Sequence, residues 1–340
     1  MKPSLRKAHM NESQPYPLMF REVYVEKIWG GRRMVDVFAK NHSMDVPIGE
    51  SWELADRQDP EETSVVTNGP LAGKSLTDVI ALMGKDLMGD VPLNKFGRFP
   101  LLIKILDAED VLSVQVHPSD EQAAQFKEPD PGKTEMWYVL DADEGSELVC
   151  GLKPGVTRED LEAALEKGAV EDLMAHIPVQ AGDSVFITTG TIHALGKGIL
   201  AAEIQVNSDL TYRLYDWGRV GLDGKPRRLD IEKSMVVIDF NMKQPEILRS
   251  GPVDITSTKE IVLAECEFFD VNLADNTDEN SLASVPGSCT ILFVVSGDCT
   301  LGWNGEKLTV APGTTVLVPA ALKDVTVSGT CRYMRTFIPN

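Results

Sequence analysis

Two segments of the chain carry polar residues of the types that bind metal ions. In LSVQVHPSD, the residues Ser113, Gln115 and His117 alternate along a predicted strand, so their side chains project from the same face. In GKTEMWYVL, Lys133 and Glu135 alternate in the same way. Taken alone, the first segment is more typical of a solvent-facing strand edge with one hydrogen-bonded histidine.

A third segment, TTGTIHALGKG, places His193 in a glycine-rich turn after a predicted strand. Together with Gln115, His117 and Glu135 it supplies two imidazoles, one carboxylate and one amide oxygen. This donor set favours zinc and would also accept manganese, iron or cobalt. Because the set contains no thiolate and does not have to close the coordination sphere, it predicts a catalytic metal site with an open position. The alternative for His193 is a turn histidine that hydrogen-bonds the backbone.

The remaining histidines are interpreted as structural or solvated: His9 in the N-terminal leader, His42 in a polar loop and His176 at the end of a helical pattern.

Charged residues near these segments suit an anionic substrate and a proton transfer. Arg213, in SDLTYRLYDWGR, could clamp a phosphate or stabilise an oxyanion. The alternative is a surface arginine paired with Asp209 or Asp216. Glu203 lies in the otherwise apolar strand AAEIQV, where burial would raise its pKa, and it is therefore a candidate general base. Its alternative is an outward-facing position on a half-buried strand.

The elements that must position these residues are predicted to be mainly β-strands, because short β-rich runs alternate with Gly, Pro and Asn as in a sandwich or barrel. The first set of expected strands comprises residues 100–106, 111–116, 136–140, 184–188, 199–206 and 211–215. The second set comprises residues 260–264, 268–273, 290–295, 309–310, 314–318 and 325–327, with tight turns at 296–298 and 304–305.

Three short helices and one domain boundary complete the predicted organisation. Ser75, Ser119 and Thr157 each precede a helical pattern as N-cap residues, and Gly168 is the expected end of the third helix. The polar, proline-flanked stretch 239–252 predicts a boundary between a domain of residues 1–245, which holds the metal site and the helices, and a smaller β-lobe of residues 246–340.

Composition excludes several classes of protein. The chain has 340 residues, 43% of them apolar, yet no apolar run approaches the length of a membrane helix or a secretion signal. A net charge of −19 argues against nucleic acid or an anionic membrane as a partner. The five cysteines form an odd set without a CxxC pair, which favours a reducing cytoplasm over a disulfide framework. They are Cys150, Cys266, Cys289, Cys299 and Cys331.

Several long segments in the same order resemble the type I mannose-6-phosphate isomerases, particularly the short bacterial members of the cupin superfamily. They are PLMFREVYVEKIWGGRRM, PIGESWELADR, FPLLIKILDAEDVLSVQVHPSD, PGKTEMWYVLDADEGSELVCGLKPG, FITTGTIHALGKGILAAEIQVNSDLTYRLYDWGR and VLVPAALKDVTV. The resemblance implies a cupin-type jelly-roll β-sandwich with a second, smaller C-terminal β-lobe. It implies zinc ligands at Gln115, His117, Glu135 and His193. It also implies catalytic and substrate-binding roles for Lys133, Glu203 and Arg213, with Ser113 near the phosphate.

Two departures from the family pattern bear on the pocket. Longer members carry a large helical insertion, whereas residues 157–177 here supply only a helix or two. The leader before Pro17 matches no family segment, and the C-terminal lobe matches mainly in its β pattern.

The resemblance implies a zinc-dependent aldose–ketose isomerase that interconverts mannose 6-phosphate and fructose 6-phosphate by proton transfer between C1 and C2. Either Glu203 or Lys133 handles the proton. The expected partner is a small sugar phosphate, and the expected state is a cytoplasmic monomer or weak homodimer.

The alternative is a non-catalytic cupin that senses or binds a sugar phosphate. A cupin oxygenase fits poorly, because it would use histidine-rich ligation of redox iron. Trp29, Trp52 and Trp137 are expected to pack in the core.

Overall fold

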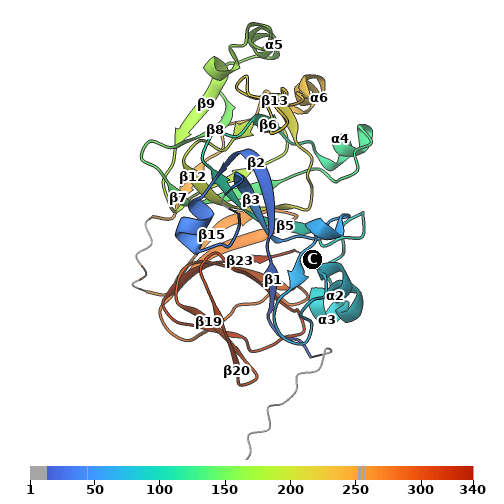
Figure 1. The fold of residues 1–340 in the computed structure, drawn as a ribbon, viewed down its shortest axis with the longest axis vertical. Helices are drawn as coiled ribbons and strands as arrows, with labels where there is room; N and C mark the ends of the chain where they lie inside the picture. The colour runs from blue at the N-terminus through green and yellow to red at the C-terminus, as the bar shows by residue number, and fades with distance from the viewer. Residues whose placement is uncertain (1–13, 44, 252–254, 256, 340) are drawn as a thin grey trace, which may run out of the picture.

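Antiparallel strands form two β-lobes that are stacked along the long axis of the molecule (Figure 1). The computed structural model describes residues 14–43, 45–251, 255 and 257–339. The leader histidine His9 and the rest of residues 1–13 lie outside the described residues.

The strands of the N-terminal lobe and its connections are β1 (Leu18–Arg21), β2 (Val23–Gly31), β3 (Ile48–Leu54), β4 (Val65–Val66), β5 (Leu101–Ala108), β6 (Val114–Val116), β7 (Glu135–Ala142), β8 (Glu147–Leu152), β9 (Met174–Pro178), β10 (Asp183–Ile187), β11 (His193–Ala194), β12 (Ile199–Val206), β13 (Tyr212–Tyr215) and β14 (Ile247–Arg249). Those of the C-terminal lobe are β15 (Lys259–Glu265), β16 (Asp270–Asn276), β17 (Asn280–Ser281), β18 (Thr290–Gly297), β19 (Cys299–Trp303), β20 (Glu306–Val310), β21 (Thr315–Val318), β22 (Thr326–Ser328) and β23 (Cys331–Phe337). The helices are α1 (Arg33–Phe38), α2 (Leu76–Met83), α3 (Lys85–Met88), α4 (Asp120–Gln125), α5 (Arg158–Lys167) and α6 (Ile231–Val237), with 3₁₀ turns at Pro60–Glu62 and Val170–Leu173.

Each lobe is a sandwich of two sheets around an apolar core. In the N-terminal lobe the order β14-β10-β7-β12-β5-β2-β3 forms one sheet and β13-β6-β11-β8-β9 the other, with Trp137 and Leu148 among the side chains packed between them. In the C-terminal lobe the sheets are β15-β16-β23-β18-β21-β1-β4 and β17-β22-β19-β20. This arrangement confirms the predicted mainly β fold with a second lobe.

The predicted strands and helix starts agree closely with the structure. β12 has the predicted bounds, and it lies between β5 and β7 with apolar residues on both faces. Ser75, Ser119 and Thr157 each form a capping box, in which the hydroxyl accepts a backbone N–H three residues ahead. Gly168 ends α5 in the left-handed conformation, at a φ of 67°.

Two local expectations need correction. Residues 111–113 lie outside β6, because that strand begins only at Val114. His176 lies on β9 and pairs with Glu147 at 3.3 Å, so it does not end a helix. The end of the helical pattern was placed too late in the sequence, because the 3₁₀ turn Val170–Leu173 before β9 continues the polar pattern of α5.

The chain crosses between the lobes at both ends of the predicted first domain. β1 pairs with β21 of the C-terminal lobe, and β14 pairs with β10 of the N-terminal lobe. The division at residues 245/246 therefore stays a prediction. Among the described residues, no helix combines the length and apolar character needed to span a bilayer, and all five cysteines are free thiols.

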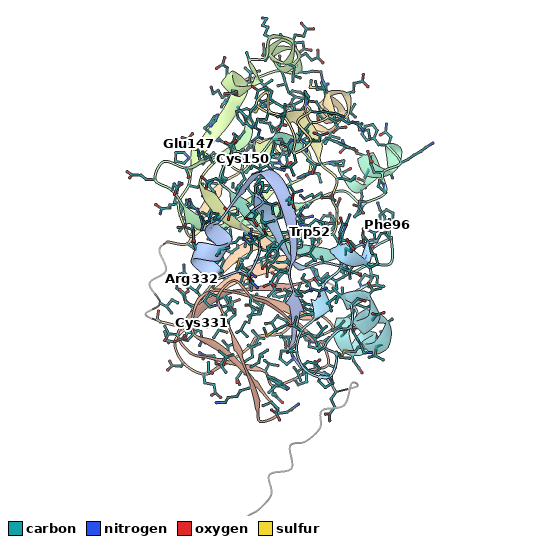
Figure 2. The ribbon with its side chains drawn as sticks, viewed as in Figure 1. Trp52, Phe96, Glu147, Cys150, Cys331 and Arg332 are labelled. Carbon is teal, nitrogen blue, oxygen red and sulfur yellow. The ribbon has the colours of Figure 1, made fainter. Side chains whose placement is uncertain are left out.

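A buried ion pair lies where the C-terminal sheet faces the N-terminal lobe. Arg332 on β23, labelled in Figure 2, donates from Nε to Asp275 Oδ1 at 2.6 Å and from Nη2 to Asp275 Oδ2 at 2.9 Å. Both side chains are buried. Burial raises the pKa of Asp275, but the hydrogen bonds from Arg332 outweigh it and lower that pKa below its usual value.

Asp275→Asn removes the charge that the buried Arg332 requires, so we expect the free energy of unfolding to fall by about 3 kcal/mol at neutral pH. Because the pKa of Asp275 is lowered in the folded state, this contribution is present above the ordinary carboxyl pKa and is lost as the pH falls through the lowered value. Urea unfolding of the wild type and of Asp275→Asn, repeated from pH 7 downward, measures this contribution to the free energy of unfolding. Asp90→Asn, in an exposed ion pair with Lys85, is the control and should change little. Equal midpoints for Asp275→Asn and the wild type at pH 7 would contradict a stabilising pair.

Candidate active site

The four predicted metal ligands meet between the two sheets of the N-terminal lobe. β11 pairs with β6 so that His193 lies opposite Gln115, while Glu135 is the first residue of β7. The Nε2 atoms of His117 and His193 lie 3.6 and 3.3 Å from the carboxylate oxygens of Glu135. The Gln115 amide nitrogen lies 3.2 Å from His193 Nε2, and a half-turn of that amide would present its oxygen instead.

Backbone carbonyls fix the orientation of both imidazoles. His117 Nδ1 donates to the carbonyl of Leu210 at 2.7 Å, and His193 Nδ1 donates to the carbonyl of Thr191 at 2.9 Å. Each ring therefore presents an unprotonated Nε2 toward Glu135. Nε2 of His117 makes no hydrogen bond with a described residue although it is buried. A buried lone pair without a partner, beside a carboxylate, fits a divalent metal ion.

The protonation states of the cluster also suit a metal. Burial, with a contribution from Lys133, lowers the pKa of His117 to about 3. Burial likewise lowers the pKa of His193. Burial alone would raise the pKa of Glu135, but the Lys133 ammonium, 2.8 Å away, outweighs burial and holds that pKa well below its usual value. Neutral imidazoles and an ionised carboxylate are the forms that bind metal.

A cavity of about 240 Å³ opens beside this cluster. Its lining includes the predicted residues Ser113, Gln115, Lys133, Glu203 and Arg213. The other lining residues are Lys27, Trp29, Glu50, Lys104, Leu106, Leu112, Asp209, Thr211 and Arg227. All eight predicted site residues are thus gathered in one place, three of them as the buried His117, Glu135 and His193 cluster.

Glu203 lies on β12 with its carboxylate in this cavity and is 2% exposed, which rules out the outward-facing alternative. Its Oε1 accepts from Trp137 Nε1 at 2.9 Å and lies 3.8 Å from Lys133 Nζ, while its Oε2 lies 3.3 Å from Lys104 Nζ. Burial raises the pKa of Glu203, although Lys133 and Lys104 oppose the shift.

Lys104 and its partner Glu50 are site residues that the sequence reasoning missed. Lys104 lies opposite Glu203 in the β5–β12 register, contacts Glu50 at 3.4 Å and lies over the ring of Trp52. A signal was present, because a single lysine in the apolar run FPLLIKILDA meets the criterion that selected Glu203. The acids Glu50 and Glu203 outweigh the burial of Lys104 and raise its pKa.

Arg213 lies at the wall of the cavity beside two further arginines. Its Nη1 donates to the carbonyl of Arg228 at 3.0 Å. Asp216, one of its two predicted alternative partners, is instead bound by Arg219 at 2.9 Å and by Arg227 Nε at 2.7 Å. Burial and the nearby Arg227 lower the pKa of Arg213. The wall therefore carries more positive charge than Asp216 neutralises.

The three tryptophans are buried, as expected, but two of them also contribute to the site. Trp137 donates to Glu203 and packs edge-on against His193, with ring centroids 5.4 Å apart. Trp29 lines the cavity.

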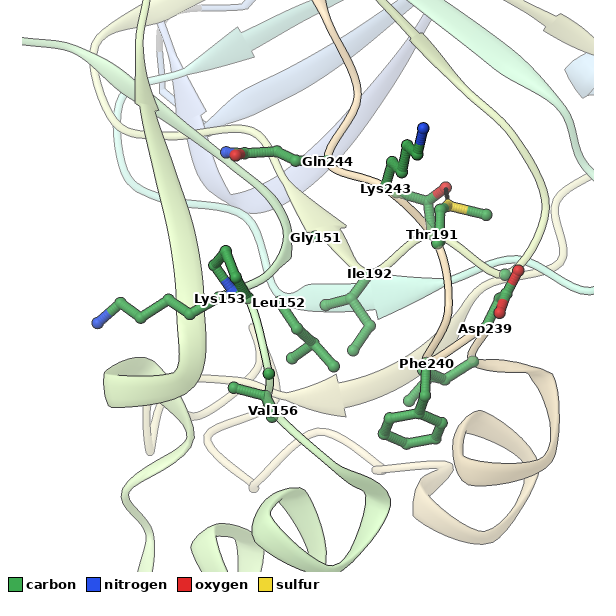
Figure 3. Close-up of a pocket in the computed structure, with 15 residues that line it drawn as sticks. Gly151, Leu152, Lys153, Val156, Thr191, Ile192, Asp239, Phe240, Lys243 and Gln244 are labelled. Carbon is green, nitrogen blue, oxygen red and sulfur yellow. Dashed lines mark hydrogen bonds between the residues drawn. The ribbon is translucent and has the colours of Figure 1, made fainter.

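A second cavity, of about 330 Å³, lies between the segments 151–156, 190–192 and 238–244 (Figure 3). It contains no cluster of histidines and carboxylates, and its Lys153 donates to the carbonyl of Asp172 at 2.7 Å. Of these two cavities, the smaller one therefore has the histidine and carboxylate groups beside it.

Comparison with known proteins agrees with this geometry. The family described as Phosphomannose isomerase type I, catalytic domain, matches residues 18–154, and the Mannose-6-phosphate isomerase, cupin domain, matches residues 259–338. The second match extends the likeness of the C-terminal lobe beyond its β pattern.

Individual relatives cover most of the chain. The probable mannose-6-phosphate isomerase GmuF of Bacillus subtilis is 36% identical over 328 residues, which span 94% of this chain and 98% of that protein. Mannose-6-phosphate isomerase ManA of the same organism is 40% identical over 75% of this chain and 78% of its own length. The crystal structure of the mannose 6-phosphate isomerase from Bacillus subtilis superposes with a TM-score of 0.84 at 32% identity, over 95% of this chain and 99% of that one. The chain therefore belongs to the type I phosphomannose isomerase family.

Proposed function

We propose that this protein is a zinc-dependent isomerase that interconverts mannose 6-phosphate and fructose 6-phosphate by proton transfer between C1 and C2. One observation carries the proposal: the buried cluster of His117, Glu135 and His193 borders a cavity that also holds the buried carboxylate of Glu203. Family membership supports the same reaction, since the relatives named above are mannose-6-phosphate isomerases.

Gln115, His117, Glu135 and His193 would hold the metal. When bound, zinc supplies a Lewis acid that stabilises negative charge on the oxygens of C1 and C2. The two imidazoles are held by backbone carbonyls, so little reorganisation is required of them.

We assign the proton transfer to Glu203. It would take the proton from C2 of the aldose as a carboxylate and return it to C1 as the acid, while the hydroxyl proton of the C2 oxygen passes to the C1 oxygen at the enediolate stage. The raised pKa of Glu203 suits both steps, because it narrows the free-energy difference between its two protonation states near neutral pH. Lys133, the other candidate, contacts Glu135 Oε2 at 2.8 Å. In that ion pair its ammonium is better placed to stabilise a developing negative oxygen than to accept a proton.

The charge of the cavity suits a phosphorylated sugar. Five basic and three acidic residues line it, so its wall is net positive within a chain of net charge −19. Arg213, Arg227 and the Ser113 hydroxyl all line this cavity and would supply donors for a phosphate. The substrate would be a free sugar phosphate, and the five free thiols fit a reducing compartment such as the cytoplasm.

The alternative is a cupin that binds a sugar phosphate without isomerising it. The cavity would then need donors for the ligand but no buried carboxylate, whose burial costs free energy. Glu203 at 2% exposure therefore favours the enzyme.

Removal of the metal should abolish the interconversion of the two sugar phosphates, and added zinc should restore it. His117→Ala and His193→Ala should each lower bound zinc and activity together. Metal analysis and a coupled assay for fructose 6-phosphate measure both. His176→Ala, at the half-exposed histidine of β9, is the matched control and should retain both. Full activity of either site variant without metal would contradict the assignment.

Glu203→Gln should lower kcat by at least about 100-fold while zinc content stays normal, because the amide cannot accept the proton. Proton exchange at C2 of the substrate in heavy water, followed by NMR, should fall in parallel. Glu147→Gln, at the exposed first residue of β8, is the control. If Glu203→Gln exchanges the proton normally and Lys133→Met does not, the base is Lys133.

Arg213→Gln should raise KM for mannose 6-phosphate about 10- to 100-fold and weaken inhibition by inorganic phosphate, since a charge-assisted contact is lost. Arg249→Gln, at an ion pair with Asp183 outside the cavity, is the control. A fall in kcat at unchanged KM would instead assign Arg213 to stabilising the oxyanion.

A further inference from the structure

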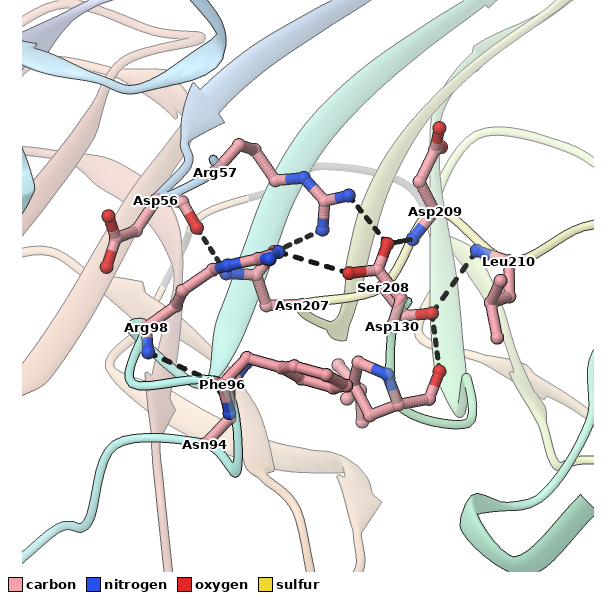
Figure 4. A network of polar contacts seen from close by, with 12 residues as sticks. Asp56, Arg57, Asn94, Phe96, Arg98, Asp130, Asn207, Ser208, Asp209 and Leu210 are labelled. Atoms are coloured by element: carbon pink, nitrogen blue, oxygen red, sulfur yellow. Dashed lines mark hydrogen bonds and ion pairs between the residues drawn. The ribbon is translucent and has the colours of Figure 1, made fainter. Parts of the chain in front are cut away.

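Outside the cavity, two arginines bind one aspartate in a buried network (Figure 4). Arg57 Nη2 donates to Asp130 Oδ2 at 2.6 Å, and Arg98 Nη1 donates to Asp130 Oδ1 at 3.1 Å. The three side chains are between 7% and 9% exposed. None of them lines the active-site cavity. Burying these charges costs desolvation free energy, which the hydrogen bonds within the cluster must offset.

The network holds the loop between β12 and β13. Asp130 Oδ2 also accepts the backbone N–H of Asp209 at 3.1 Å. Arg57 Nη1 donates to the side-chain oxygen of Asn207 at 3.0 Å, and the Asn207 amide donates to the carbonyls of Asp56 and Phe99, each at 2.8 Å. Residues 207–211 belong to no strand, so these contacts replace the ladder that would otherwise fix the backbone.

A hydroxyl extends this network to the metal cluster. Ser208 Oγ donates to the carbonyl of Pro131 at 2.7 Å and accepts the N–H of Leu210 at 3.2 Å. The carbonyl of Leu210 then accepts from His117 Nδ1 at 2.7 Å. A continuous set of hydrogen bonds therefore links the segment containing Asp130 and Pro131 to the imidazole.

This link decides the orientation of one metal ligand. His117 follows the end of β6, and the Leu210 carbonyl is the hydrogen-bond partner of its Nδ1. If the loop moved, the ring would lose both its fixed tautomer and its direction toward Glu135. The same loop carries Asp209 and Thr211, which line the cavity.

We propose that Asp130, held by Arg57 and Arg98, is a positioning residue that fixes the Leu210 carbonyl and thereby aims His117 at the metal. The inference rests on the proposed metal site, and it adds residues that do not touch substrate or metal. A purely structural cluster would contribute to stability alone, whereas a positioning cluster also sets the affinity and the coordination geometry of the ion.

Asp130→Asn tests this role when it is compared with Asp275→Asn, which removes one charge from a buried arginine–aspartate pair in the other lobe. Both variants should unfold at lower urea concentration. Asp130→Asn alone should bind Zn²⁺ about 10- to 100-fold more weakly in competition with a chromophoric chelator. The absorption spectrum of its Co²⁺-substituted form should also differ from that of the wild type, while the spectrum of Asp275→Asn should not.

Ser208→Ala provides a second variant in case Asp130→Asn does not fold. It deletes the hydroxyl that joins Pro131 to Leu210 but leaves the arginine–aspartate cluster intact. We expect weaker Zn²⁺ binding and an altered Co²⁺ spectrum here too. Wild-type affinity and spectrum in the folded variants would overturn the positioning role while leaving the proposed function in place. A wild-type protein that binds neither ion would overturn the metal site itself.

Discussion

A carboxylate without access to solvent lies at the centre of the site, and the cost of burying its charge constrains the residues around it. Glu135 is 0% exposed. An ionised group in such surroundings requires opposite charge and directed donors within a few ångströms. The Lys133 ammonium lies 2.8 Å away and supplies that charge, while the unprotonated Nε2 atoms of His117 and His193 face the two oxygens of Glu135. The divalent ion proposed for this site would complete the arrangement, because it would bind both nitrogens and the carboxylate.

The sheet that contains β5, β7 and β12 places further pairs of opposite charges in the cavity. Because β12 pairs with β5 on one side and with β7 on the other, Glu203 lies opposite both Lys104 and Trp137. Side chains alternate between the faces of a strand, so a shift of one residue in this register would turn Glu203 away from the cavity. The apolar faces of β5, β7 and β12, together with the C-terminal lobe packed against them, hold that register in place. The packing of two lobes thus determines which charges meet.

Much of the site could be predicted from local patterns. Strand alternation placed Gln115 and His117 on one face, and the types of the donors indicated a metal. The three helix starts were predicted for a similar reason, because a capping side chain contacts a backbone group only three residues away. The strands β1 and β14, which pair across the lobes, are among those not assigned, because runs of four and three residues are too short to show a clear alternation.

The sequence by itself therefore determined the mainly β fold, the ligand types and the family likeness, all of which depend on residue identity and short-range spacing. Only the tertiary structure decided that Lys104 faces Glu203, that Asp216 binds Arg227 and leaves Arg213 free to face the cavity, and that the Leu210 carbonyl orients His117. Those contacts join residues far apart in the chain or on separate loops. Their geometry follows from sheet register and from the packing of buried polar groups, which local spacing does not encode.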